Sequence, residues 1–128
     1  MKSKKIILWE ILVPTIMDEK LVKTSHHKIW DMKVRAISSG LTILKTTKGE
    51  WISSDGELFA EKMIPVRIAC SENAIEDIMD ITIEHYKQEE AMAYKVSECV
   101  KFRKVKEDLG LGFMKAETRR IKKYKEKV

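Results

Sequence analysis

Cysteine is scarce in this chain of 128 residues, and the two cysteines that occur are far apart. Cys70 and Cys99 have no second cysteine at CxxC spacing and no histidine pair that would complete a metal site. A structural zinc site needs four ligands at recognisable spacings, and a disulfide scaffold needs several paired cysteines. The sequence therefore excludes both kinds of crosslinked fold and predicts buried, free thiols.

Long apolar runs are also absent, because no run approaches the roughly 18 residues that a membrane-spanning helix needs. The start of the chain superficially resembles a signal peptide, since three lysines precede an apolar run at residues 6–13. That run contains Glu10 and meets Pro14, with no small-residue cleavage site after it. We therefore expect a first strand here, in a cytoplasmic protein that has no membrane partner.

The familiar catalytic motifs are missing too. The chain contains no HExxH, P-loop, GxSxG or GxGxxG pattern, so catalysis of those kinds is not indicated. His26 and His27 are adjacent, and adjacent helical residues diverge by about 100°, so at most one of them can face a given pocket. No metal ion and no cofactor is expected.

Charged residues are abundant but unevenly placed. They make up 35% of the chain, against 44% apolar residues, which indicates a modest core with a heavily solvated exterior. Residues 101–128 contain eleven Lys or Arg and four Asp or Glu, a net charge of +7, whereas residues 1–100 carry a net −2. We therefore predict a domain at residues 1–100 and a basic C-terminal extension at residues 101–128, with a basic helix at residues 118–128.

The order of apolar and turn-forming segments predicts an α+β fold, a ferredoxin-like βαββαβ sandwich. The predicted strands cover residues 5–13, 41–45, 58–70 and 89–96, the helices begin near residues 25 and 73, and a polar ribbon lies at residues 50–53. Residues 15–24 are expected to form a loop. This fold hosts many unrelated activities, so it does not by itself reveal a function.

Both predicted helices carry signals for their ends and their buried faces. Thr24 or Ser25 is the expected N-cap of the first helix, and Gly40 is its expected stop. In the second helix, Asn73 and Glu76 resemble a capping box. The expected buried faces are Ile29, Met32, Ala36 and Ile37 in the first helix and Ile75, Ile78, Met79, Thr82 and Tyr86 in the second.

Glycines and a proline set the expected turns and one strand irregularity. Lys48-Gly49 and Asp55-Gly56 carry turn chemistry on either side of the polar ribbon. Pro65 lies within the strand predicted at residues 58–70 and removes one backbone donor from it. We therefore expect that strand to be at an edge of the sheet or bulged at Pro65, although the ferredoxin-like order places it near the middle.

Polar side chains at the ends of the predicted strands are the candidate ligand contacts. Glu61 opens an apolar run, and Gln88 and Glu89 lie between the second helix and the last strand. Each of them also fits a solvated strand end or loop, and both interpretations stay open at this point. Trp51 is harder to explain as a solvated residue, because an indole between two turns gains little from water. It predicts either a lid that stacks on a ligand or a contact between subunits.

Several short segments occur in a recognisable order along residues 5–97. They are Ser25-His26-His27-Lys28, Gly40-Leu41, Trp51, Glu61-Lys62 with Val66-Arg67, and Gln88-Glu89 with Tyr94-Lys95. This order resembles that of the phage S-adenosylmethionine (SAM) lyases. The resemblance implies a ferredoxin-like fold related to the trimeric PII-like proteins, with sites that lie between subunits of a homo-oligomer.

The resemblance also implies roles for single residues. Glu61 matches a glutamate that the family requires, and Gln88 matches a glutamine at the final junction of helix and strand, so these two are the implied catalytic residues. The family's aromatic residue ahead of the glutamate is usually Tyr, so only stacking or enclosure carries over to this chain, and no phenolic hydrogen bond does. The implied substrate contacts are Trp51, His27, Glu89 and Tyr94.

The implied reaction is intramolecular. The carboxylate of the substrate attacks its own γ-carbon and expels methylthioadenosine, which leaves homoserine lactone. The sulfonium is already a good leaving group, so the protein must chiefly hold the attack geometry and exclude water. Related proteins occur beside CRISPR systems that signal with SAM–AMP, a SAM adenylylated on its amino-acid part, so the implied small-molecule partner is SAM or SAM–AMP.

Two other functions fit the same sequence. A non-catalytic PII-like or CutA-like trimer that binds a nucleotide or metabolite needs no catalytic motif. The other function is a nucleic-acid-binding module that acts through residues 101–128. Its aromatic residues Phe102, Phe113 and Tyr124 are not placed among the basic residues at the spacing that base stacking needs. A nucleic-acid partner is therefore not expected.

Overall fold

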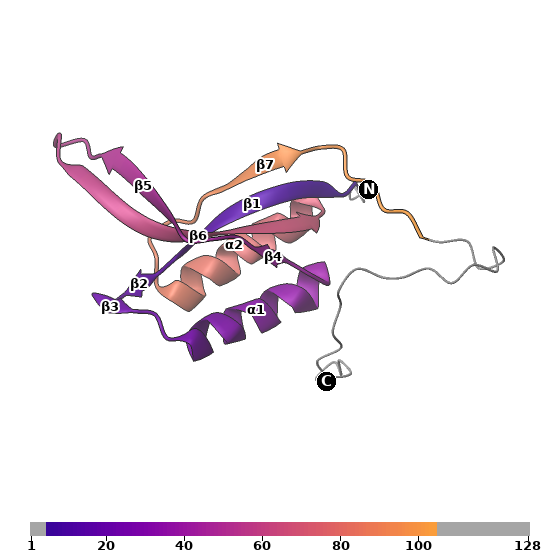
Figure 1. Ribbon diagram of the computed structural model, residues 1–128, viewed down its shortest axis with the longest axis horizontal. Helices are drawn as coiled ribbons and strands as arrows, with labels where there is room; N and C mark the ends of the chain where they lie inside the picture. Colours follow the sequence, from indigo (N-terminus) through magenta and orange to yellow (C-terminus); the bar gives the residue numbers. More distant parts are fainter. Residues whose placement is uncertain (1–4, 105–128) are drawn as a thin grey trace.

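Residues 5–104, the part of the chain that this computed structural model describes, contain two helices packed on an antiparallel sheet (Figure 1). In chain order the elements are β1 (Ile7–Pro14), β2 (Ile16–Met17), β3 (Lys20–Leu21), α1 (Thr24–Ser38), β4 (Thr42–Ile43), β5 (Thr47–Ile52), β6 (Leu58–Cys70), α2 (Glu72–Tyr86) and β7 (Ala93–Ser97). Apart from the short β2–β3 hairpin, the order is strand, helix, paired strands, helix, strand. The predicted ferredoxin-like βαββαβ architecture is confirmed.

The main sheet has five strands, in the order β4–β6–β1–β7, with β5 also paired to β6. β6 is 13 residues long. Its residues 63–70 pair with β1, and its residues 58–63 pair with β5. The β5–β6 hairpin therefore extends past the end of β1, and Figure 1 shows it projecting from the body of the protein. We call this projection, residues 47–62, the arm.

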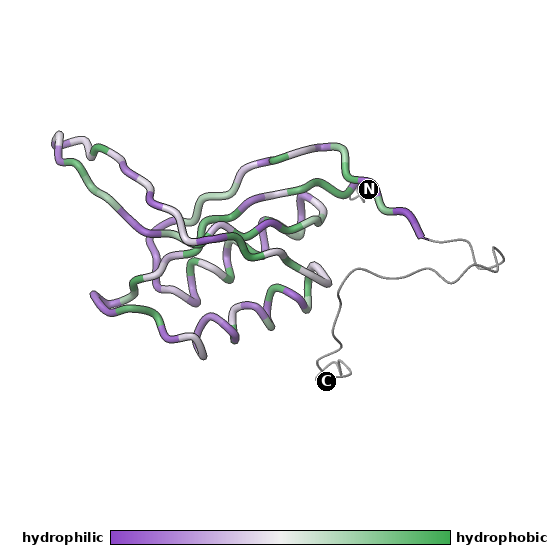
Figure 2. The backbone as a smooth tube through the Cα atoms, in the orientation of Figure 1, coloured by the Kyte–Doolittle hydropathy of each residue, from purple (hydrophilic) through white to green (hydrophobic). Residues whose placement is uncertain are grey.

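Alternation along β1 decides which face of the sheet is buried. The side chains that point toward the helices are at most 8% exposed, and they are Ile7, Trp9, Ile11 and Val13. Figure 2 shows this apolar stretch, and Figure 1 shows both helices on the same side of the sheet. Successive strand residues point to opposite faces, so Glu10 points to the other side, which no described element covers. We call that side the open face.

The apolar face predicted for α1 is wrong. Trp30 and Val34 are buried there, and the Trp30 indole donates a hydrogen bond to Thr82 Oγ1 at 3.0 Å, which anchors α1 against α2. The predicted residues Ile29, Met32 and Ile37 remain 44%, 45% and 39% exposed, respectively. Both sets of residues fit helical spacing, and burial of the large indole with its partner decides between them.

The predicted ends of α1 are also wrong, by one or two residues. The N-cap is Lys23, which forms no side-chain cap bond, so neither Thr24 nor Ser25 caps the helix. At the other end Ser39, and not Gly40, adopts the left-handed conformation, with φ at 71°. Its N–H still donates to the carbonyl of residue 35 at 2.9 Å, so the turn is closed without glycine.

α2 follows its prediction more closely. Ser71 is the N-cap in place of Asn73, and its Oγ accepts a hydrogen bond from the Ala74 N–H at 3.2 Å. The cap has the expected three-residue spacing but begins two residues earlier, because the helix begins directly after β6. Four of the five predicted residues are buried, Met79 is only partly buried, and His85 is added; the buried residues are Ile75, Ile78, Thr82, His85 and Tyr86.

Only one of the two predicted turns forms. Gly56 has φ at 83° and closes the Asp55-Gly56 turn with a hydrogen bond to the Ser53 carbonyl at 2.9 Å. Gly49 instead lies inside β5, where a Cβ atom would come within 2.5 Å of Met63 Cε. That atom is the far end of a flexible side chain and can move aside, so the close approach does not strictly require glycine. The loop predicted at residues 15–24 contains the β2–β3 hairpin.

Pro65 lies in a central strand, and the sheet accommodates it without a bulge in the pairing of β6 with β1. It pairs with Leu12 in that ladder, while its carbonyl accepts from the Leu44 N–H at 2.9 Å on the other side. On that other side β5 pairs with β6 only as far as Met63 and β4 only from Val66 onward. The nitrogen of Pro65, which carries no hydrogen, therefore faces the gap between β5 and β4. All ladder hydrogen bonds between β6 and β1 can still form.

Two further predictions concern the ends of the described chain. β7 begins at Ala93 and not at residue 89, so the loop that precedes it is longer than expected. The basic helix predicted at residues 118–128 lies outside the described residues. Among residues 5–104, neither helix has the length and apolarity that crossing a membrane requires.

Candidate functional site

Trp51 and Glu61, both predicted from the sequence, come together on the arm. The register places Trp51 opposite Phe59, and their rings stack with centroids 4.7 Å apart. The Trp51 indole N–H donates to Glu61 Oε1 at 3.4 Å. All three side chains are exposed in the single chain. We call Trp51, Phe59 and Glu61 the arm cluster.

The arm cluster combines an aromatic surface with a carboxylate. Aromatic faces stack on flat rings and attract cations, and a carboxylate accepts charge-assisted hydrogen bonds from an ammonium. The cluster lies on paired strands, which hold the two kinds of group at a fixed separation. It therefore suits a ligand that carries both a flat ring and a positive charge.

Gln88 and Glu89 lie in the loop between α2 and β7 and not on the arm. The chain turns at Lys87, whose φ is 54°, and the Gln88 side-chain amide donates to the Tyr86 carbonyl at 3.1 Å. Glu89 is exposed. Within one chain, the two predicted catalytic residues Glu61 and Gln88 therefore belong to different parts of the fold.

His27 lies on α1, with its Nδ1 2.7 Å from the Tyr86 hydroxyl. Both residues border a hollow of about 240 Å³ that also has the apolar side chains of Ile43 and Ile64 in its wall. Burial lowers the pKa of His27 and raises the pKa of Tyr86 well above its ordinary value. Both groups are therefore neutral near pH 7, and the charged groups that line this hollow are Lys28 and Asp31.

A second pair of side chains lies between the helices, and no sequence pattern indicated it. The rings of His26 and His85 stack with centroids 3.9 Å apart, and each Nε2–H donates to the backbone carbonyl of the other residue at 2.8 Å. A carbonyl only accepts, so both Nε2 atoms carry a proton. Lys33 Nζ donates to His85 Nδ1 at 3.3 Å, so that atom is unprotonated. Because 59 residues separate the two histidines, only the folded chain reveals the pair.

We expect the protein to lose stability as the pH falls below about 6.5. Burial lowers the pKa of both His27 and His85, and the positive charge of Lys33 lowers that of His85 further. The unfolded chain therefore binds protons before the folded chain does. Stability is full above the ordinary value of 6.5 and falls as the pH drops toward the lowered values. Burial raises the pKa of Asp31, so the folded chain takes up this proton before the unfolded chain does. That uptake stabilises the folded chain as the pH falls, but only closer to 3.8, the ordinary pKa of the carboxyl group.

Urea unfolding at several pH values between pH 7.5 and 5.5 measures this effect. A His85→Gln variant keeps an amide donor for the His26 carbonyl but has no titratable ring, so its stability should vary less over the same range. Equal pH dependence of the parent and the variant would contradict the role assigned to His85.

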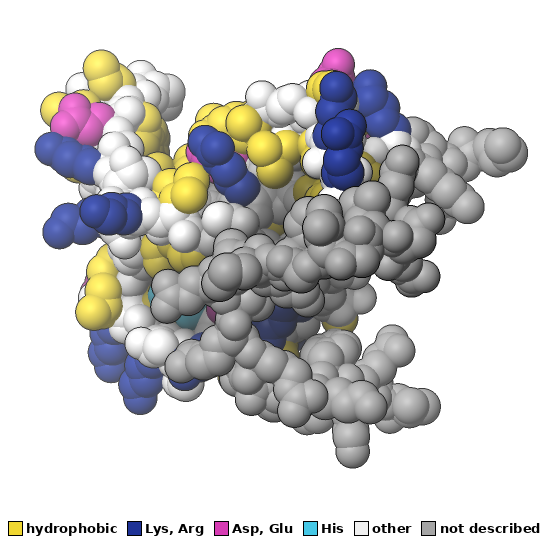
Figure 3. All heavy atoms as spheres, turned by 45° about the vertical axis from the view of Figure 1, so that its right-hand side comes forward, with side chains coloured by type: hydrophobic (Ala, Val, Ile, Leu, Met, Phe, Trp, Pro, Cys, Tyr) yellow, Lys and Arg dark blue, Asp and Glu magenta, His cyan; other side chains and the backbone are white. Residues whose placement is uncertain are grey.

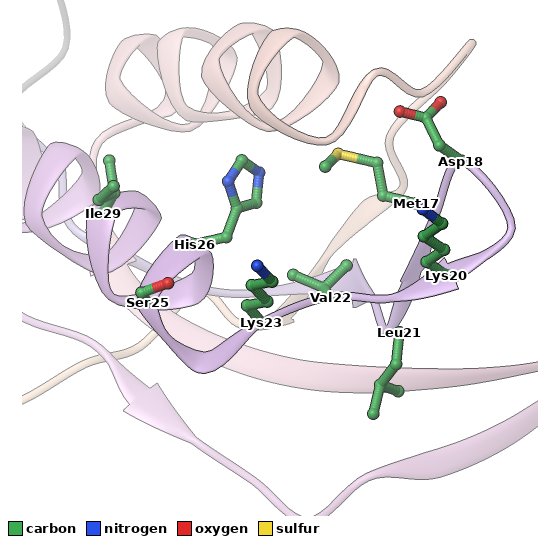
Figure 4. Close-up of a pocket in the computed structure, with 9 residues that line it drawn as sticks. All are labelled: Met17, Asp18, Lys20, Leu21, Val22, Lys23, Ser25, His26 and Ile29. Carbon is green, nitrogen blue, oxygen red and sulfur yellow. The ribbon is translucent and has the colours of Figure 1, made fainter.

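A larger hollow, of about 430 Å³, lies between the β2–β3 hairpin and the start of α1 (Figure 4). Figure 4 shows the Met17 thioether and the His26 ring pointing toward α2. Asp18 at the rim forms an ion pair with Lys87 at 3.3 Å, which ties the hairpin to the end of α2. The lining of this larger hollow contains none of the site residues predicted from the sequence.

A buried carboxylate on the open face is a further candidate that the sequence did not single out. Glu10 is only 7% exposed, although it lies in a strand of apolar residues. The Arg67 Nε–H donates to Glu10 Oε1 at 3.0 Å, and the Tyr94 hydroxyl donates to Glu10 Oε2. Tyr94, a predicted substrate contact, is therefore held by this group, which we call the open-face cluster. The available signal was a charged residue inside an apolar strand, because a buried charge needs partners.

Several large apolar side chains stay exposed near these groups. On the arm and β7 they are between 37% and 69% exposed, and they are Trp51, Ile52, Leu58, Phe59, Tyr94 and Val96. Figure 3 shows exposed hydrophobic side chains between groups of Lys and Arg on the described surface. Extended apolar surface of this kind marks contact sites for other molecules.

Comparison with known proteins places the fold. No protein-family model matches the chain, and no curated protein matches it in sequence. The solved structure of CutA1 from Shewanella sp. SIB1 has a TM-score of 0.59 at 11% identity, over 78% of this chain and 87% of that one. CutA1 from Oryza sativa has a TM-score of 0.56 at 9% identity, over 77% and 83%.

A phage SAM lyase in complex with S-methyl-5′-thioadenosine is also similar in structure. Its TM-score is 0.54 at 13% identity, over 77% of this chain and 85% of that one. Identities this low show a shared fold and leave the activity open. The chain therefore has the ferredoxin-like fold that CutA1 proteins share with a phage SAM lyase.

Proposed function

We propose that this chain is a lyase that cleaves SAM or SAM–AMP, with the arm cluster at its substrate site. The observation that carries the proposal is the hydrogen bond between Trp51 and Glu61. The resemblance to phage SAM lyases assigns both residues to the site, and they lie together on an exposed arm. The substrate presents an adenine ring, a sulfonium and an ammonium, which match the stacked rings and the carboxylate of the cluster.

The proposed reaction needs few protein groups. In SAM, a carboxylate oxygen of the substrate forms a bond to its γ-carbon while the carbon–sulfur bond breaks and its electron pair passes to sulfur. Methylthioadenosine leaves as a neutral thioether, and homoserine lactone keeps the ammonium, so no proton has to move. Glu61 would hold that ammonium and Gln88 would orient the substrate, because fixing the attack geometry can supply about 7–11 kcal/mol.

We further propose that the working form is a homotrimer with its sites between subunits. One chain holds Glu61 on the arm and Gln88 at the end of α2, so a neighbouring copy would supply the missing partner. The exposed apolar side chains of the arm provide surface for such a contact. Glu89, His27 and Tyr94 remain proposed substrate contacts, and the last two already hold hydrogen bonds within the chain. The proposed compartment is the cytoplasm.

We expect purified protein to release methylthioadenosine from SAM, or the AMP-bearing counterpart product from SAM–AMP, as measured by liquid chromatography and mass spectrometry. Light scattering at micromolar concentration should give about three times the chain mass of 14.9 kDa. A monomer that converts neither substrate would contradict both parts of the proposal.

The alternative function is a non-catalytic, CutA-like trimer that binds a nucleotide or metabolite. The CutA1 structures favour it, since their similarity in fold is as high as that of the SAM lyase. The arm cluster would then bind its ligand without converting it. Binding of methylthioadenosine together with no turnover of SAM or SAM–AMP would favour this alternative.

A further inference from the structure

The exposed side of α2 carries a regular row of carboxylates. Glu72, Glu76, Asp80 and Glu84 are spaced four residues apart, and all four are exposed. Side chains four residues apart are neighbours on one side of a helix. Residues 72–86 contain no Lys or Arg to interrupt this row. We call these four residues the acidic stripe.

The acidic stripe is electrostatically unfavourable as it stands. Like charges four residues apart repel each other and destabilise a helix. Glu84 lies in the last turn, where the helix dipole disfavours negative charge. Within residues 5–104, no ion pair includes a member of the stripe, and Lys95, whose pKa Glu72 helps to raise, is itself paired with Glu98. The stripe therefore forms no ion pair in the described part of the chain, although Lys95 interacts electrostatically with Glu72.

The C-terminal extension carries the same spacing with the opposite charge. Lys115, Arg119, Lys123 and Lys127 also repeat every four residues, and the last three lie in the basic helix predicted at residues 118–128. In a helix these four cations share one side and span the same length as the acidic stripe, about 18 Å. We call them the basic stripe; they lie outside the described residues.

The last strand, β7, ends near the start of α2. The register pairs Ile7 with Cys70 and Leu8 with Ser97, so the end of β7 lies near the end of β6, which leads into α2. Residues 105–114 connect the last described residue to the basic stripe, and extended they reach roughly 35 Å. α2 is about 22 Å long, so the connection permits docking in either direction.

α1 is not a competing surface for a basic segment. It carries Lys28, Lys33 and Arg35 against a single acid, Asp31, so its charge has the same sign as the extension. We propose that the basic stripe docks along the acidic stripe of the same chain, helix against helix. The docked segment relieves the repulsion within α2 and gives the basic stripe a defined partner.

Zero-length carbodiimide crosslinking followed by peptide mass spectrometry tests this docking on the full chain. The reagent joins amines to carboxylates in direct contact, so at low salt the stripe lysines should join to the acidic stripe. Reversing two charges, Glu76→Lys with Asp80→Lys, should reduce these crosslinks about fivefold or more. Adding Arg119→Glu and Lys123→Glu to that variant should produce new crosslinks, in which the introduced lysines of α2 join the introduced glutamates of the extension.

The matched control reverses two exposed acids in the turn of the arm, Asp55→Lys with Glu57→Lys, and should leave the crosslinks unchanged. A mixture of unlabelled and ¹⁵N-labelled chains shows whether the two joined peptides come from one chain. Crosslinks found only between differently labelled chains would mean that a second copy occupies α2, which overturns the proposal. Crosslinks that survive the charge reversal also overturn it.

If the reversed variant fails to fold, the parent protein alone still decides the question. Crosslinks at surface ion pairs must weaken as sodium chloride is raised toward 1 M, because the screening length shortens to about 3 Å. Crosslinks that ignore salt, or a complete absence of crosslinks to the acidic stripe at low salt, refute the docking. Binding of a nucleic-acid duplex that leaves the crosslinks intact would place that partner elsewhere on the chain.

Discussion

Glu61→Gln should lower the turnover of SAM or SAM–AMP by at least tenfold, and by up to about a hundredfold. The variant keeps the shape of the side chain, and its amide oxygen can still accept from the Trp51 indole. What it loses is the negative charge that would hold the substrate ammonium, a charge-assisted bond that contributes about 1.5–3 kcal/mol. The initial rate of methylthioadenosine release at saturating substrate measures the effect.

Two comparisons keep this result specific. Glu57→Gln removes an exposed carboxylate from the same hairpin and should leave turnover unchanged, which controls for the charge of the arm. The stability of the Glu61→Gln protein should match that of the parent, because Glu61 is exposed and packs no core residue. A Glu61→Gln protein as active as the parent would sink the assignment, whereas no turnover from either protein would favour the CutA-like alternative.

The fold was predictable because its strands and helices differ in periodicity and are separated by clear turn signals. β1, β6 and α2 carry that pattern most cleanly, and each formed where expected. α1 did not follow its predicted face, because Ile29 and Trp30 mark two apolar sides of one helix. The choice between them depends on the Trp30 bond to Thr82, a contact across 52 residues that no local pattern contains.

The candidate site was predictable only where its residues are close in the chain. Trp51 and Glu61 are ten residues apart on one hairpin, so local strand pairing is enough to bring them together. The open-face cluster joins Glu10 to Arg67 and Tyr94 across 57 and 84 residues, and the strand order alone decides those neighbours. The predicted pairing of Glu61 with Gln88 requires a second copy, so it stays a prediction.

The second large effect concerns the open-face cluster. Arg67→Met should reduce the free energy of unfolding by about 1–3 kcal/mol, because Glu10 then keeps only the Tyr94 hydroxyl as a partner. Breaking a fully buried pair costs more, about 3–5 kcal/mol, but the Arg67 side chain is 43% exposed and water can partly replace it. Urea unfolding at pH 7.5 measures the change, and Lys62→Met, at an exposed lysine on the same strand, is the control.

A double variant distinguishes two causes of the lost stability, an unpaired buried charge at Glu10 and the loss of packing by the Arg67 side chain. Glu10→Gln with Arg67→Met leaves no buried charge, and the amide oxygen can still accept from the Tyr94 hydroxyl, so it should regain at least half of the stability lost by Arg67→Met. Arg67→Met and the double variant would be equally unstable if packing of the arginine stem were the whole effect.

Light scattering on the same samples shows whether the cluster also supports the oligomer. If the open face packs against other copies, the single variant should dissociate at higher protein concentration than the parent, and the double variant should fall between them.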